Sequence, residues 1–196
     1  MKTDAKTLAG TAILGTLVVV FDYSLKYSGF KIPFPWLPYL KFDFTGVPIV
    51  LSLLFFGLAS GITTSAVALL AILARSGDVV GATMKALAEF STILGMAIGL
   101  RLLKRNTKLT KILSLILGLS LRSIVMLLAN LIVFPAMAVM YAMLLLVFFN
   151  CIQGSISIIF GYFLYGVVAQ KLSFPSPRKE PRLTKTVRRK DSSSSA

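Results

Sequence analysis

Three side-chain amides are the residues best suited to recognising a small ligand. Asn130, Asn150 and Gln153 lie in long apolar stretches, and each amide offers both hydrogen-bond donors and an acceptor. Such groups suit a neutral ring whose edge alternates carbonyl oxygens and ring nitrogens. The alternative is that they join helices by hydrogen bonds, which contribute about 0.6 kcal/mol each in membranes. We favour a ligand site because all three fall towards the same side of the topology derived below.

Four ionisable residues also lie within apolar stretches, namely Asp22, Lys85, Glu89 and Arg122. Charges inside a membrane are costly, so each is expected to face a cavity or a partner. Lys85 and Glu89 are four residues apart on one helix face, and we favour a mutual ion pair over a role in binding ligand. Arg122 lies too far from the end of its stretch to reach water and requires an internal acceptor, which the sequence does not identify.

Aromatic residues and prolines crowd residues 27–44. The prolines at positions 33, 35 and 38 exclude a regular helix there. The Tyr, Phe and Trp rings fit two roles equally well, a belt at the membrane interface or a lid over a flat aromatic ligand.

The chain shows no signature of bond chemistry. It has no histidine, a single cysteine and no GxxxxGK[ST] phosphate loop, and no nucleophile or paired-carboxylate motif stands in a plausible site. We therefore expect a protein that is not an enzyme, with no catalytic residues, no metal site and no cofactor. Any energy for uphill transport would come from partners or from an ion gradient.

Composition indicates an integral membrane protein, because 56% of the 196 residues are hydrophobic and only 14% are charged. The net charge of +14 could suggest nucleic-acid binding, but 13 of the 21 lysines and arginines lie in residues 101–111 and 171–196. That distribution is typical of cytoplasmic segments flanking membrane spans, so no nucleic-acid partner is expected.

The elements that must position these residues are six membrane-spanning helices. A span needs roughly 20 apolar residues, and residues 46–74 are too long for one. A glycine at each end of residues 57–61 indicates a break between two shorter helices. The predicted membrane domain is 1–170, followed by a basic, Ser/Pro-rich tail at 171–196 that we expect to be disordered; its helices are predicted at about 7–25, 46–57, 60–74, 83–100, 112–133 and 143–170.

The positive-inside rule places residues 101–111 and the tail in the cytoplasm. Six helices with a cytoplasmic N-terminus and five with an external one satisfy that rule equally, and the length of residues 46–74 favours six. The predicted fold is thus all-α, with both termini cytoplasmic, in a multi-pass protein of the cell membrane.

Several stretches resemble the S components of energy-coupling factor (ECF) vitamin transporters, specifically the riboflavin type. The resemblance spans about residues 9–170 and is carried by residues 33–48, 54–61, 88–90, 122–135 and 149–154. It implies a substrate-binding subunit that takes riboflavin from the outer face beneath the loop between helices 1 and 2. It also implies delivery inward with a transmembrane coupling subunit and two cytoplasmic ATPases.

The resemblance further implies roles for individual residues. The small-residue motif on the first helix would contact the coupling subunit through Ala9, Ala12 and Thr16. The expected ligand-binding residues, which combine this resemblance with the amides and charges above, are Leu40, Asp43, Glu89, Asn130, Asn150 and Gln153.

The chain departs from the riboflavin pattern at three positions. Gln153 stands where lysine is typical, Glu89 where asparagine is typical, and Lys85 replaces a usual glycine. These changes keep a different flat heterocyclic vitamin open as the ligand. Two further hypotheses are an ion-coupled secondary transporter using the four ionisable residues as a relay, and a purely structural or assembly subunit.

Overall fold

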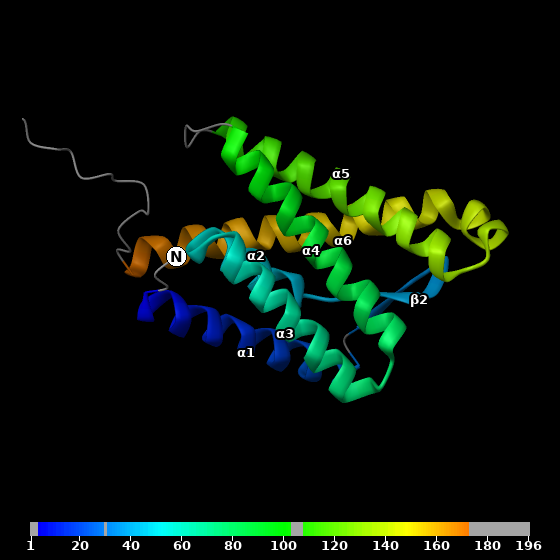
Figure 1. The fold of residues 1–196 in the computed structure, drawn as a ribbon, viewed down its shortest axis with the longest axis horizontal. Coiled ribbons are helices and arrows are strands. Elements are labelled where there is room, and N and C mark those ends of the chain that lie inside the picture. Colours follow the sequence, from blue (N-terminus) through cyan, green and yellow to red (C-terminus); the bar gives the residue numbers. More distant parts are fainter. Residues whose placement is uncertain (1–3, 30, 103–107, 173–196) are drawn as a thin grey trace, which may run out of the picture.

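The computed structural model describes residues 4–29, 31–102 and 108–172, which form six helices and one β-hairpin (Figure 1). The prediction of six helices is confirmed, and the hairpin is an element that the sequence did not predict. The helices are α1 (Ala5–Tyr27), α2 (Gly46–Phe56), α3 (Leu58–Ser76), α4 (Val79–Leu102), α5 (Lys108–Val133) and α6 (Ala136–Leu172), and the strands are β1 (Ile32–Phe34) and β2 (Leu37–Phe42).

Five of the helices are long and apolar enough to cross a membrane, whereas α2 has only 11 residues. The predicted break in residues 46–74 lies at Gly57, where α2 ends and α3 begins. Gly57 has a φ of 91°. Side chains with a Cβ rarely adopt this backbone conformation, so glycine permits the sharp turn between the two helices.

The long helices run between the two ends of the molecule, which lie at the left and right of Figure 1. One end, on the right of the figure, carries the β-hairpin, the α3–α4 turn and the α5–α6 turn. The other end carries the start of α1 and the end of α6. The predicted tail at 171–196 lies outside the described residues after Leu172.

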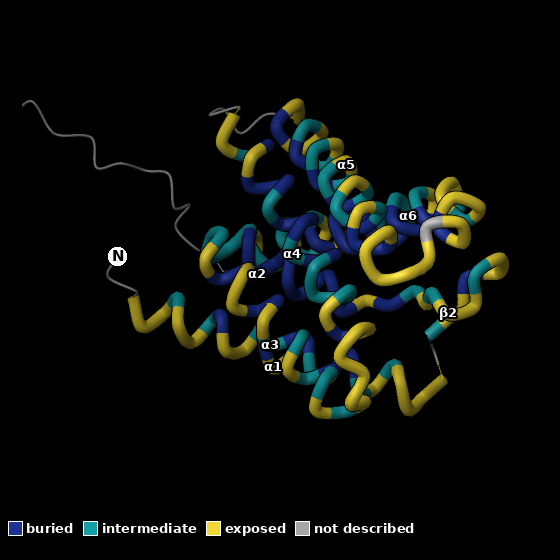
Figure 2. Tube along the Cα trace, turned by 45° about the vertical axis from the view of Figure 1, so that its right-hand side comes forward, coloured by how far each residue is buried: buried dark blue, intermediate teal, exposed yellow. Residues whose placement is uncertain are grey.

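The short helix α2 lies at the centre of the bundle, between α1, α3, α4 and α6. All eight of its residues from Gly46 to Leu53 are buried (Figure 2). Its core side chains, Ile49, Val50 and Leu53, belong to one buried cluster with residues of α1, α3, α4 and α6. A helix that is apolar on every side suits this central place.

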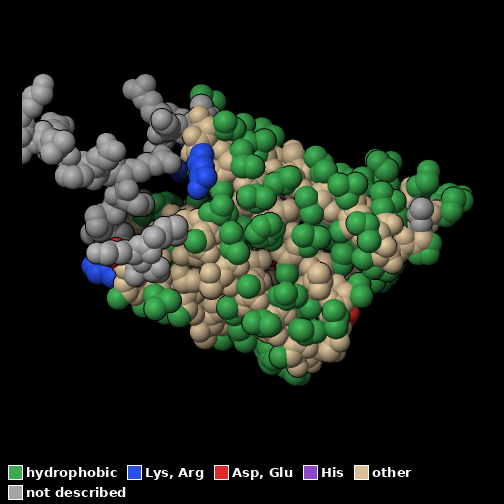
Figure 3. Space-filling view, viewed as in Figure 1, with side chains coloured by type: hydrophobic (Ala, Val, Ile, Leu, Met, Phe, Trp, Pro, Cys, Tyr) green, Lys and Arg blue, Asp and Glu red, His purple; other side chains and the backbone are tan. Residues whose placement is uncertain are grey.

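The outer faces of the long helices are apolar, as a lipid environment requires. Ile13 of α1, Ile116 of α5 and Leu144 of α6 are each more than half exposed. Figure 3 shows hydrophobic side chains spread over this face, with the visible lysines and arginines at the end that holds the termini.

The hairpin pairs β1 and β2 antiparallel, with Ile32 opposite Phe42. Phe34 is only 2% exposed and contacts Phe42 of β2 and Phe149 of α6, at ring-centroid distances of 5.9 and 5.5 Å. This aromatic cluster fixes the hairpin to the bundle. Trp36, in the turn, is 62% exposed.

Candidate functional site

A cavity of about 440 Å³ opens at the hairpin end of the bundle. It lies between β2, the first half of α4, the second half of α5 and the first half of α6. Its apolar wall includes Met84, Met126, Leu146 and Phe149. Its polar wall includes Lys41, Asp78, Lys85, Arg122, Asn130, Asn150 and Gln153.

Arg122 is the best-connected polar residue in this wall, and it is 2% exposed. Its Nε donates to Asn150 Oδ1 over 3.2 Å, and its Nη1 donates to Glu89 Oε1 over 3.2 Å. Nη1 also donates to Thr92 Oγ1 and to the carbonyl oxygen of Ala88. Nη2 has no hydrogen-bond partner within the described ranges, so its two N–H groups are free for a ligand.

Glu89 lies behind Arg122 and is fully buried. Its Oε1 accepts from Arg122, while its Oε2 has no partner among the residues that the structure describes. The start of α2 closes over this carboxylate, because a Cβ built on Gly46 would lie 2.6 Å from Oε2. Only glycine allows such an approach, which also brings the positive end of the α2 dipole near the carboxylate.

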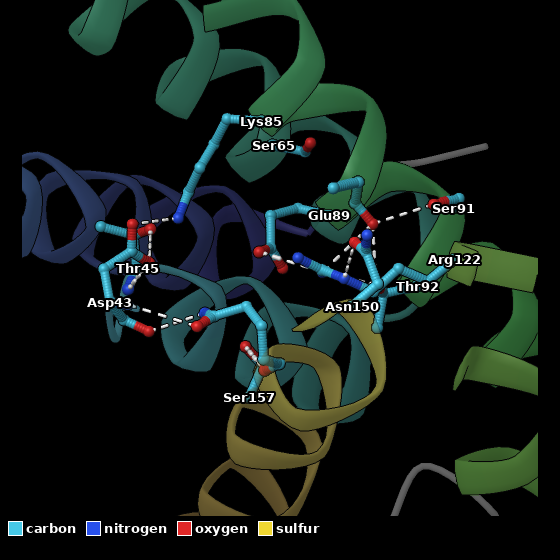
Figure 4. Close-up of polar contacts among 12 residues, drawn as sticks. Asp43, Thr45, Ser65, Lys85, Glu89, Ser91, Thr92, Arg122, Asn150 and Ser157 are labelled. Carbon is cyan, nitrogen blue, oxygen red and sulfur yellow. Dashed lines mark hydrogen bonds and ion pairs between the residues drawn. The ribbon is translucent and has the colours of Figure 1, made fainter. Parts of the chain in front are cut away.

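Lys85 pairs with Asp43 rather than with Glu89. Figure 4 shows Lys85 extending from α4 to Asp43, while Glu89, one turn further along α4, points to Arg122. The predicted Lys85–Glu89 pair is therefore wrong. The physical reason is that each side chain meets an opposite charge from another part of the chain, which the four-residue spacing within α4 does not reveal.

Asp43 connects the end of the hairpin to the start of α2. Its Oδ1 accepts from Thr45 Oγ1 and from the Thr45 backbone N–H, at 2.7 and 3.2 Å, and its Oδ2 accepts from Lys85. Burial alone would raise the pKa of Asp43, but the Lys85 ammonium and the hydrogen bonds from Lys85 and Thr45 outweigh it. The pKa is held below its ordinary value, so Asp43 is ionised at neutral pH.

Gln153 of α6 binds the backbone of the same residue. Its Nε2 donates to the carbonyl oxygen of Asp43 over 2.7 Å, and its Oε1 accepts from the Asp43 N–H over 3.3 Å. The two bonds resemble a rung of a β-ladder and hold the hairpin exit against α6.

Asn130 and Asn150 are oriented by their own helices. The Nδ2 of Asn130 donates to the Met126 carbonyl oxygen at 2.7 Å, and that of Asn150 to the Leu146 carbonyl oxygen at 2.8 Å. Asn150 Oδ1 accepts from Arg122. Asn130 Oδ1 has no partner in the described part of the chain, so it remains an acceptor beside the cavity.

Of the six ligand-binding residues predicted from sequence, Leu40, Asn130, Asn150 and Gln153 line the cavity. Asp43 and Glu89 lie behind it, holding the cations that do line it. Lys85 and Arg122 were missing from that set. The signal for them was the high cost of a charge within an apolar helix, which marks both as functional candidates.

The other predicted contact surface lies on α1. Ala9, Ala12 and Thr16 are all exposed, and the Thr16 hydroxyl donates back to the Ala12 carbonyl oxygen at 3.0 Å. Their small side chains leave a shallow strip on the outer face of the helix, where another helix could approach closely.

The side chains of the cavity wall are of the kinds that bind a small molecule. The cavity wall combines cationic donors and amides with apolar side chains. Within the described residues, no three His, Cys, Asp or Glu side chains gather in a way that could hold a metal ion.

Comparison with solved structures gives a close structural match. No protein-family model matches the chain, and no curated protein matches it. Among solved structures, the S component of a bacterial ECF transporter is 32% identical and superposes with a TM-score of 0.70. The match covers 86% of this chain and 98% of that chain.

Proposed function

Because the chain belongs to the S components of bacterial ECF transporters, and so is a substrate-binding membrane subunit, we propose that its substrate is riboflavin or a closely related flavin. The observation that carries this proposal is the free Nη2 of Arg122 in a cavity that is rich in donors. A flavin fits because the pyrimidine edge of its ring presents carbonyl oxygens and ring nitrogens, with a single N–H donor among them.

The charges of the cavity favour an acceptor-rich, uncharged ring. Lys85 and Arg122 line the cavity, whereas their acidic partners, Asp43 and Glu89, do not. At Lys85 and Arg122 a ligand would therefore meet N–H donors whose positive charge is already balanced by a carboxylate behind the wall. Lys41 and Asp78, which form no ion pair within the described residues, are both exposed and opposite in sign. Asn130 Oδ1 supplies the acceptor for the one donor on the ligand edge.

The apolar wall supports the same ligand. Met126, Leu146 and Phe149 offer side chains that can pack on the faces of a flat ring, and Met84 lies on the α4 side. Apolar walls with a few placed polar groups are the usual form of a small-molecule site.

We propose an orientation in which the hairpin end faces outward and both termini face the cytoplasm of a cell membrane. The basic residues Arg101, Lys108, Lys111 and Lys171 lie at the ends of helices opposite the hairpin, as the positive-inside rule requires of a cytoplasmic side. The ligand would then enter from outside, beneath the hairpin.

Transport would use a transmembrane coupling subunit and two cytoplasmic ATPases. The exposed strip of Ala9, Ala12 and Thr16 is the proposed contact with the coupling subunit. The chain itself would bind and release ligand, and the ATPase partners would supply the energy.

The second candidate is another flat heterocyclic vitamin. It is favoured by Gln153, because both polar atoms of its amide bond the Asp43 backbone instead of facing a ligand. The charges of Lys85 and Glu89 at the site also depart from the riboflavin pattern. An ion relay is less well supported, because Asp22 pairs with Lys31 and Arg75 in a cluster separate from the Arg122–Glu89 pair.

The test begins with mass spectrometry of small molecules that co-purify with the protein in detergent. Ligand-free protein is then titrated with riboflavin while flavin fluorescence is followed, and with thiamine, a cationic heterocycle, while the fluorescence of Trp36 is followed. We expect nanomolar, saturable binding of riboflavin and none of thiamine. A lack of saturable flavin binding, or a co-purifying vitamin of another class, would overturn the flavin proposal.

A further inference from the structure

The hairpin is tied to the bundle by an ion pair at each end. Before β1, Lys31 Nζ lies 2.6 Å from Asp22 Oδ1 of α1. After β2, Asp43 pairs with Lys85 of α4. The hairpin therefore has two ionic attachments, in addition to its aromatic contact through Phe34.

The two ion pairs differ in whether the acid has a second cation beside it. Asp22 has a second cation, because Arg75 Nε of α3 lies 2.6 Å from its Oδ2. Loss of Lys31 would thus leave Asp22 paired. Within the described residues Asp43 has a direct ion pair with Lys85 alone, and Lys31 acts on it only from a distance, so without Lys85 the buried carboxylate would keep hydrogen bonds from neutral donors only. A buried charge that loses its ionic partner destabilises the arrangement strongly.

Lys85 is also the ion-pair member closest to the ligand site. It lines the cavity, whereas Asp43 does not. An ammonium carries three N–H donors, and among the described residues Asp43 is the one hydrogen-bond acceptor of Lys85. Donors therefore remain for an acceptor atom in the cavity.

We propose that Lys85 is a positioning residue that latches the hairpin over the cavity through Asp43, and that the latch slows ligand release. The latch holds the hairpin in the absence of ligand. When an acceptor-bearing ligand contacts the remaining Lys85 donors, the ammonium joins ligand and hairpin, so the ligand leaves only when the latch opens. The effect on ligand release rests on the proposed function, whereas the latch on the ligand-free hairpin does not.

Trp36 makes the hairpin observable without a ligand. It is the single tryptophan of the chain, lies in the hairpin turn and packs edge-on against Phe34 at a centroid distance of 5.2 Å. Trp36 is already more than half exposed, but Phe34, against which it packs, lies in turn on Phe149 of α6. Undocking removes the α6 ring from this cluster and uncovers the remaining part of the Trp36 ring, so a rise in acrylamide quenching above the wild-type level reports undocking.

The experiment compares Lys85→Met with Lys41→Met in full-length protein reconstituted in lipid nanodiscs. Lys41 also lines the cavity, but it is exposed and forms no ion pair in the described part of the chain, so it is a matched control. In ligand-free protein we expect acrylamide quenching of Trp36 to rise in Lys85→Met and to stay at the wild-type level in Lys41→Met. Equal quenching in wild type and Lys85→Met would overturn the latch.

A double-mutant cycle separates a latch from two independent effects. Asp43→Asn should raise Trp36 quenching as Lys85→Met does, and the double variant should be no worse than either single variant. Lys85→Arg, which keeps the charge, should stay near wild type. Additive effects in the double variant, or a Lys85→Arg protein that behaves like Lys85→Met, would each contradict the proposal. If Lys85→Met does not fold, acrylamide quenching of Trp36 in Asp43→Asn and Lys85→Arg tests the latch instead.

Ligand release is measured in a separate arm by stopped-flow flavin fluorescence. We expect riboflavin to leave Lys85→Met at least roughly tenfold faster than wild type, since truncating one partner of a buried charge pair acts mainly on the dissociation rate. An unchanged release rate with an undocked hairpin would overturn the link to ligand. Wild-type protein that binds no riboflavin would overturn the flavin proposal and leave the Trp36 result to decide the latch.

Discussion

Arg122 Nη1 lies 3.2 Å from Glu89 Oε1 in a layer where the two side chains are 3% and 0% exposed. An ion pair this deep in a membrane protein carries a large desolvation cost, and the free Oε2 of Glu89 adds to it. The arrangement leaves Arg122 Nη2 without a partner among the described side chains beside a cavity. We interpret the pair as a scaffold that holds a guanidinium ready for a ligand.

The first prediction separates the contribution of this ion pair to protein stability from its role in binding riboflavin. Glu89→Leu leaves a buried, uncompensated cation and should lower the free energy of unfolding by about 3–5 kcal/mol. The double variant Glu89→Leu/Arg122→Met removes both charges and should recover most of that loss of stability. It should not bind riboflavin, because the Arg122 guanidinium is gone. Thermal melts in detergent and flavin titrations measure the two quantities. Recovered binding in the double variant would show that Arg122 does not contact ligand.

The second prediction concerns Asn150, whose Oδ1 accepts from Arg122 Nε. Asn150→Ala removes an amide from the cavity wall and frees the Arg122 Nε, so riboflavin affinity should fall at least roughly tenfold, the effect of one lost buried hydrogen-bond partner. Ser123→Ala, on the outer side of α5 against Cys151, is the control and should bind normally. Unchanged affinity in Asn150→Ala would remove this residue from the site.

How far the sequence predicts this fold depends on the range of each interaction. The six helices follow from the lengths of apolar runs and from Gly57, all of which are local signals. The hairpin was missed because its strands contain Pro33 and Pro38, and strands rarely tolerate proline except at edges. A two-stranded hairpin has only edge strands, so the prolines fit.

The candidate site shows the same limit. Residue types marked the amides and the charged residues as functional candidates, and four predicted residues line the cavity. The partners of the charges were not predictable, because Lys85 meets Asp43 across 42 residues and Arg122 meets Glu89 across 33 residues. Helix spacing predicts only neighbours on one helix, and it favoured a Lys85–Glu89 pair that tertiary packing replaces.

The third prediction follows from the lowered pKa of Asp43. A carboxyl group whose folded pKa lies below its unfolded value contributes stability above the unfolded pKa and loses it as pH falls through the folded pKa. Hairpin docking, followed by Trp36 quenching, should therefore be constant from neutral pH down to about pH 5 and weaken only below the ordinary carboxyl range.

The Lys85→Met variant supplies the contrast for this pH experiment. Without the ammonium, burial becomes the main influence and raises the pKa of Asp43. The pH dependence should then reverse: docking of Lys85→Met is weak at neutral pH, and Trp36 quenching should fall towards the wild-type level as acid neutralises the buried Asp43 carboxylate. The same pH dependence in the two proteins would mean that Lys85 does not set the ionisation of Asp43.

The fourth prediction tests the close approach at the start of α2. A Cβ at Gly46 would collide with Ser157 Oγ and Glu89 Oε2, both buried, so Gly46→Ala should destabilise the protein by about 1–3 kcal/mol. Gly166→Ala is the matched control, because a Cβ at Gly166 of α6 meets nothing within 4 Å. In a helix interior the control should be neutral or stabilising by up to about 1 kcal/mol. Equal melting temperatures for both variants would contradict the packing argument.

The fifth prediction addresses the exposed strip on α1 and separates binding from transport. Ala12→Leu fills the strip without touching the cavity, so riboflavin affinity in detergent should be unchanged, whereas uptake by vesicles that also contain the coupling subunit and both ATPases should fall at least roughly tenfold. Ser120→Leu enlarges another exposed small residue, on α5, and should transport normally. Normal uptake by Ala12→Leu would place the coupling surface elsewhere. Loss of uptake in both variants would show that any bulky change on the lipid-facing side blocks transport, so that the α1 strip has no special role.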